Sequence, residues 1–108
     1  MPQFYTEEEA TQAIKKLISR KLFQNARAAI EENLVVFPDS NTLQFLSSHI
    51  ALETNDFSNA IQILEKLNKA DPNQAQVLIP LARSWNLFGD IDKAIDYLNQ
   101  AESTDADP

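Results

Sequence analysis

One histidine and several groups of carboxylates are the side chains whose types suit catalysis. His49 directly follows Ser48, but a serine nucleophile needs a base that faces it, and adjacent residues of a helix do not face each other. The carboxylates occur as Glu7-Glu8-Glu9, Glu31-Glu32 and Asp90-Ile91-Asp92. Such groups can serve in acid–base catalysis or hold a metal, but these fall at expected helix starts and on polar faces, and none has the spacing of a calcium loop. We therefore predict no catalytic residue and no metal site.

The composition removes further classes of site. The chain has no cysteine, which excludes disulfides, thiolate catalysis and Cys-based zinc sites. Its single glycine, Gly89, excludes glycine-rich phosphate loops and dinucleotide fingerprints. Nine Lys and Arg residues against sixteen Asp and Glu residues give a formal net charge of −7, which disfavours nucleic-acid binding. We therefore expect no cofactor and no nucleic-acid partner.

The length and apolar content fit one domain over residues 1–108. With 108 residues and 44% hydrophobic side chains, the chain can bury one continuous core. The first residues lack both a basic leader and an apolar run of signal-peptide length, and no stretch approaches the roughly 20 apolar residues of a membrane span. We expect a soluble, cytoplasmic protein with no membrane partner.

The sequence repeats itself with a period of 34 residues. A shift by 34 aligns residues 55–61 with residues 89–95, with identities at the Asp, the Ala and the Ile, and also places Pro38 under Pro72. The resulting copies cover residues 7–40, 41–74 and 75–108. Each copy contains two apolar segments with helical spacing, separated by a short polar turn, which predicts a helix–turn–helix unit.

Local signals predict the helices of these units. They are expected over residues 7–20, 23–36, 41–53, 57–69, 74–88 and 91–102. Thr6 and the three glutamates after it form a capping-box pattern, and Asp56 and Asp90 are the expected N-caps of the fourth and sixth helices. Pro80 falls inside the fifth helix, so we expect a kink there or a late helix start. The acidic tail, residues 103–108, is expected to fray.

With these residues the chain resembles the tetratricopeptide repeat family, whose 34-residue pattern runs W-x2-L-G-x2-Y, then A-x3-F, then P. The third copy carries Trp85 in its first helix and Ala94 in its second, and Ala26 and Ala60 hold the place of Ala94 in the other copies. A small residue suits this place because the paired helices cross closely there. The resemblance implies an all-α fold, a right-handed superhelical α-solenoid of three helix–turn–helix repeats and six helices.

The resemblance also implies a binding groove. In this family the first helix of each repeat lines a concave groove, with one consistent phase of the helix facing it. That phase selects Glu8, Thr11, Lys15, Ile18, Thr42, Phe45, His49, Leu52, Gln76, Ile79, Arg83 and Asn86. The candidate peptide-binding residues among them are Thr11, Lys15, Phe45, His49, Leu52, Ile79, Arg83 and Asn86. Lys15, His49 and Arg83 share one repeat position, so they could form a basic line that meets the carboxylates of a peptide, with apolar anchors beside it. The alternative is that these are ordinary exposed side chains, paired with neighbouring acids.

One known binding mode of the family does not fit. Some members bind the carboxyl-terminal tails of chaperones with a clamp of Lys, Asn and Arg residues. The matching places here hold Thr11, Lys15, Leu46, Gln76 and Pro80. The clamp is therefore mostly missing.

The end of the array is a second candidate surface. Repeat arrays need a polar element at each end, because each repeat buries its apolar face on its neighbour. Only the acidic tail follows the expected sixth helix, so an apolar interface is expected at Ile91, Ile95, Tyr97 and Leu98. This surface would serve self-association or the docking of a partner, unless neighbouring polar residues cover it in a monomer or the chain is a piece of a longer array.

These features together predict a non-catalytic protein–protein interaction module, an adaptor or scaffold, that binds a peptide or partner protein with acidic residues in its groove. The alternative is a structural oligomerisation unit, a homo-oligomer that associates through the apolar face of its third repeat.

Overall fold

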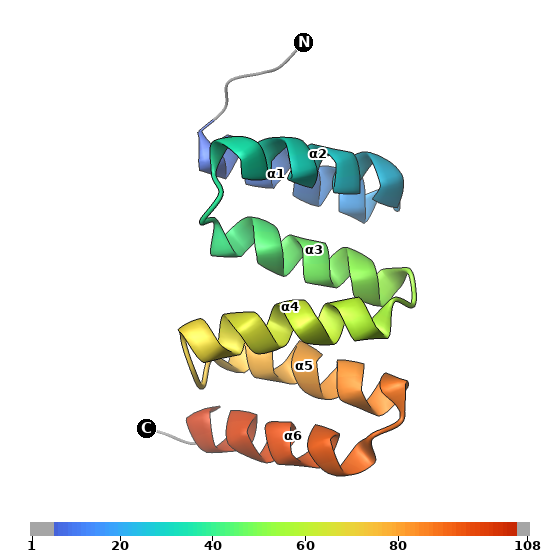
Figure 1. Cartoon of the computed structure of the whole chain (residues 1–108), viewed down its shortest axis with the longest axis vertical. Coiled ribbons are helices and arrows are strands. Elements are labelled where there is room, and N and C mark those ends of the chain that lie inside the picture. The colour runs from blue at the N-terminus through green and yellow to red at the C-terminus, as the bar shows by residue number, and fades with distance from the viewer. Residues whose placement is uncertain (1–5, 106–108) are drawn as a thin grey trace.

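Residues 6–105 fold as a stack of six helices. The computed structural model describes residues 6–105. The helices are α1 (Glu7–Ser19), α2 (Phe23–Val36), α3 (Asn41–Glu53), α4 (Phe57–Ala70), α5 (Ala75–Phe88) and α6 (Ile91–Asp105). Each packs mainly on the helices next to it in sequence, so α1 and α6 lie at opposite ends of a stack that measures 46 × 30 × 21 Å (Figure 1). The prediction of an all-α repeat solenoid with six helices is confirmed.

Polar side chains cap the first turns of α1, α3, α4 and α6, whereas α2 and α5 have no side-chain cap. The Glu9 backbone N–H donates to Thr6 Oγ1 at 3.1 Å, and the Thr6 N–H donates to Glu9 Oε1 at 3.0 Å, which completes the capping box. Ser40, 34 residues later, caps α3 in the same way by accepting at 3.1 Å from a backbone N–H. Asp56 and Asp90 accept from the backbone N–H three residues ahead at 3.4 and 3.1 Å. The predicted caps of the first, fourth and sixth helices are confirmed.

The turns inside the three hairpins share one backbone conformation. Lys21, Asn55 and Gly89, which are spaced 34 residues apart, have φ angles of 60°, 64° and 115°. This left-handed region ends a helix by letting the chain reverse direction, and it favours glycine and then asparagine. Lys21 is the residue least suited to it, because its Cβ crowds the following carbonyl.

Four helix boundaries differ from the sequence predictions: the ends of α1 and α4 and the start of α5 by one residue, and the end of α6 by three. The helix α5 begins at Ala75, ahead of Pro80, so the late start predicted as one alternative is wrong. Helix α6 continues to Asp105, whereas the pattern predicted an end at residue 102 and a frayed tail over residues 103–108. No glycine or proline lies between residues 103 and 105, so helix propagation continues there; residues 106–108 lie outside the described part.

The core runs along the stack between successive helices. One buried cluster joins α1, α2 and α3 through Ile14, Ala26, Ile30, Leu43, Leu46 and Ile50. A second joins α4 and α5 through Ile61, Leu64, Leu67, Val77 and Leu81. The equivalent alanines Ala26, Ala60 and Ala94 are all buried, as the close crossing of paired helices predicts.

Neither a membrane-spanning helix nor a metal-binding cluster occurs in residues 6–105. No helix there combines the length and the apolar character needed to cross a bilayer. In the same range, no three His, Asp or Glu side chains gather where they could hold a metal ion.

Candidate functional site

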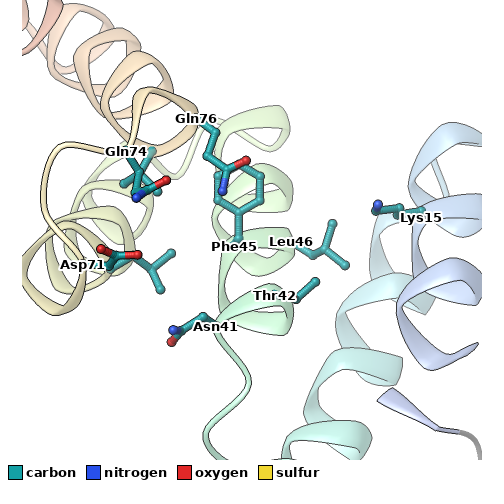
Figure 2. A pocket seen from close by; sticks show the side chains of 10 residues that line it. Lys15, Asn41, Thr42, Phe45, Leu46, Asp71, Gln74 and Gln76 are labelled. Carbon is teal, nitrogen blue, oxygen red and sulfur yellow. The ribbon is translucent and has the colours of Figure 1, made fainter. Parts of the chain in front are cut away.

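A cavity of about 310 Å³ opens between α1, the first turns of α3 and the connection from α4 to α5 (Figure 2). Its lining consists of Lys15, Asn41, Thr42, Phe45, Leu46, Leu67, Asp71, Gln74, Gln76 and Val77. The apolar members form one part of this wall, and amides, a hydroxyl and two charges form the rest. A space of this size matches the lower end of ligand pockets and accommodates one or two side chains of a bound peptide.

The packing of α3 explains why its first turns face the cavity. Leu43, Leu46 and Ile50 are buried against α1 and α2, which fixes the rotation of the helix. The neighbouring side chain of Phe45 is thereby turned toward the next repeat, and Thr42 also lines the cavity. Phe45 is half-buried and packs on the α4–α5 cluster, so one side of its ring remains part of the cavity wall.

The two charges of the cavity lie on opposite sides of it. Figure 2 shows Lys15 on α1 and Asp71 just after α4, with Phe45 and Leu46 between them. Lys15 is exposed, and its side chain makes no hydrogen bond or ion pair within residues 6–105. Its ammonium group therefore keeps its hydrogen-bonding capacity for a ligand.

The predicted basic line is only partly brought together. Lys15, His49 and Arg83 are all exposed, but only Lys15 lines the cavity. His49 Nε2 lies 4.0 Å from Glu53 Oε2, one turn along α3, so the alternative of pairing with a neighbouring acid fits this residue. Arg83, like Lys15, has no such partner within the described residues.

The structure contradicts the prediction that Thr11 and Leu52 bind a peptide in the groove. Both side chains are 6% exposed, so they cannot contact a peptide. Leu52 packs with Ala51, Ala60 and the half-buried Phe57 in the core of the second hairpin. Asn86 is exposed but does not line the cavity, and Ile79 lines a different hollow beside α6.

The cavity also contains residues that the sequence analysis missed. Asp71 and Gln74 come from the connection between the second and third repeats, and Leu67 comes from the end of α4. The groove positions were chosen only from the first helix of each repeat, so this connection was not considered. The signal available was its polar run, Asp71-Pro72-Asn73-Gln74, directly after an apolar helix.

A shared acceptor joins the last three helices. Oε2 of Glu65 on α4 accepts a hydrogen bond from Trp85 Nε1 at 3.0 Å and one from the Tyr97 hydroxyl at 3.1 Å. The Nζ of Lys93 lies 4.2 Å from the centre of the Trp85 ring, a cation–π distance. Burial, then the negative charge of Glu65 and then the hydrogen bond to it, raise the pKa of Tyr97.

The structure therefore contradicts the prediction that Tyr97 belongs to the apolar interface at the end of the array. Its ring packs on the α4–α5 cluster and its hydroxyl reaches Glu65, so it points into the stack. Ile91, Ile95 and Leu98 are exposed. Ile95 and Leu98 line a hollow with Ile79 of α5, and Glu102 stands at its edge.

A family model described as a tetratricopeptide repeat matches residues 51–108, which is more than half of the chain. The matched part begins within α3 and includes α4, α5 and α6. No curated protein matches the chain.

Proposed function

The chain belongs to the tetratricopeptide repeat family, and from this premise we propose that it is a non-catalytic adaptor or scaffold module that binds a peptide segment of a partner protein in the cavity between α1, α3 and α5. Repeats of this family generally mediate protein–protein interactions and are typically non-catalytic. The peptide it takes carries a carboxylate next to an apolar side chain.

The observation that carries this proposal is the position of an unpaired cation beside an apolar wall. Lys15 has no internal partner among the described residues, and Phe45, Leu46 and Val77 form the wall next to it. A carboxylate of the peptide would form a charge-assisted hydrogen bond with the ammonium group, while its neighbouring side chain fills the space against Phe45. Asp71, across the cavity, disfavours a second acid at that end and so gives the bound peptide a direction.

Polar side chains around the cavity suit a peptide backbone. Asn41, Thr42, Gln74 and Gln76 supply both donors and acceptors at the wall. A peptide that enters the cavity loses its hydrogen bonds to water, and these side chains replace them. The binding mode is thus an anchored side chain surrounded by polar contacts.

The test is a peptide selection followed by titration. A random peptide library is selected on the wild-type protein, and affinities of the enriched peptides are measured by calorimetry. We expect enrichment of an acidic residue next to an apolar one, and at least a tenfold loss of affinity with Lys15→Glu or Phe45→Ala. Lys16→Glu is the matched control, because Lys16 is exposed on the same helix and does not line the cavity. Equal losses with Lys15→Glu and Lys16→Glu would show a general charge effect and refute the site.

A further inference from the structure

The outer face of α6 carries apolar side chains that are exposed although their equivalents in the other repeats are buried. Leu98 is 48% exposed, whereas Ile30 and Leu64, at the same repeat position, are 2% and 0% exposed. Ile95 is exposed, whereas Ile61 at its position is buried. The difference arises from the place in the stack, since the residue types are alike.

The first and second repeats show what covers this position. Ile30 is buried by Leu43, Leu46 and Ile50 of the following helix α3, and Leu64 by Val77 and Leu81 of the following helix α5. In both cases the cover is a helix of 13 or 14 residues that places apolar side chains against the preceding helix. The same shape is complementary to the hollow formed by Ile79, Ile95 and Leu98.

Because α3 and α5 cover the equivalent residues of the first and second repeats, we infer that the hollow between α5 and α6 is a docking site for an amphipathic helix of a partner protein. The apolar residues of this partner helix are spaced as in α3, and basic residues lie along its edge that faces α6. This site is separate from the cavity of the proposed function.

The charges beside the hollow determine the basic edge of the partner. Glu102 lines the hollow, and α6 carries two further exposed acids, Asp92 and Asp96, which are not part of the lining. The basic side chain of Lys93, also on α6, lies over the Trp85 ring. The α6 side of the site is therefore acidic, and lysines or arginines of the partner would be favoured there.

A second copy of this chain is a poor occupant. Head-to-tail stacking would place α1 where α3 sits on α2, but the α1 residues at the positions of Leu43, Leu46 and Ile50 are Glu9, Gln12 and Lys16, all exposed and polar. Tail-to-tail pairing would bring the acids of two α6 helices together. At these positions α1 is thus polar, whereas the equivalent place at the other end of the described residues, beside α6, has exposed apolar side chains.

The test uses two synthetic peptides as probes. Both have the sequence of residues 40–54, the helix that covers Ile30, with the exposed positions Asn41, Thr42 and His49 changed to lysine in one and to glutamate in the other. They are titrated into isotope-labelled protein, and backbone amide shifts are followed by NMR, which detects millimolar affinity. We expect the lysine peptide to shift the amides of Ile79, Ile95 and Leu98, and to bind at least tenfold more tightly than the glutamate peptide.

Variants of exposed residues complete the test. Leu98→Asp and Ile95→Asp should each lower the affinity for the lysine peptide at least tenfold, with an unchanged circular dichroism spectrum. Val35→Asp is the matched control, because Val35 is an apolar side chain of α2 that is 82% exposed. Equal affinity for the two peptides, no binding at all, or shifts confined to Lys15 and Phe45 would overturn the inference. A dimer in light scattering that Leu98→Asp dissociates would overturn it too, since the occupant would then be a second copy.

Discussion

Replacing Glu65 by alanine should destabilise the last three helices together. The carboxylate of Glu65 accepts hydrogen bonds from Trp85 on α5 and Tyr97 on α6, so its removal leaves two half-buried donors without their acceptor. A hydrogen bond contributes about 0.5–1.5 kcal/mol net, and more when the acceptor is charged and buried. Because all three side chains are partly exposed, water replaces part of the loss. We therefore expect the free energy of unfolding to fall by about 1–3 kcal/mol.

Urea denaturation followed by circular dichroism measures this loss, and Trp85, the single tryptophan, provides an independent fluorescence signal. A loss of 1–3 kcal/mol corresponds to a fall in melting temperature of roughly 5–15 °C for a domain of this size. Glu65→Gln keeps an oxygen acceptor and should lose less. Glu32→Ala is the control, because the Glu32 side chain is exposed and makes no hydrogen bond in the described part. This substitution should change the free energy of unfolding by less than about 0.5 kcal/mol.

A double-mutant cycle decides whether the hydrogen bonds cause the loss. In a Tyr97→Phe background, Glu65→Ala should cost less than in the wild type, because one donor is already gone. If the cost is the same in both backgrounds, or if Glu65→Ala is no more damaging than Glu32→Ala, then Glu65 is not the shared acceptor that stabilises α4, α5 and α6.

Two further predictions concern the turns and the pH dependence. Lys21→Gly should raise the free energy of unfolding by about 0.5–1 kcal/mol, because relief of the left-handed strain exceeds the entropy cost of glycine. Asn55→Gly should give little gain in the same urea assay. Equal gains for the two substitutions would contradict the strain argument. The raised pKa of Tyr97 means that the folded state favours the neutral phenol, so this contribution is fully present below about pH 10 and is lost as the pH rises through the folded pKa. Tyr97→Phe should therefore flatten the decline of the melting temperature above about pH 10, and an unchanged slope would refute the assignment.

The helices could be predicted from the sequence because their signals are local. Thr6, Asp56 and Asp90 cap helices by contacts within three residues, and the buried alanines recur at one repeat position. These properties depend on neighbours along the chain, which a 34-residue shift already shows. The helix boundaries therefore agree closely, and the larger difference, at the end of α6, lies where the composition suggested fraying.

The candidate site could be predicted only in part, because exposure depends on what the next repeat covers. Thr11, Phe45 and Ile79 share one repeat position, yet Thr11 is buried, Phe45 is half-buried and Ile79 is exposed. The exposure of these three side chains thus increases from the first repeat to the third. Asp71 reaches the cavity through the folding of a connection between repeats, and the periodicity of helices contains no information about that.

Packing between sequence neighbours has a consequence for how the chain folds. Each helix has its main packing partner among the residues that immediately precede or follow it, so most of the packing in residues 6–105 forms between segments that are close in the sequence. Loop closure is then entropically inexpensive, and a topology of this kind folds quickly. During synthesis, the first hairpin can form while the last is still being made, and the growing chain adds helices to an existing surface.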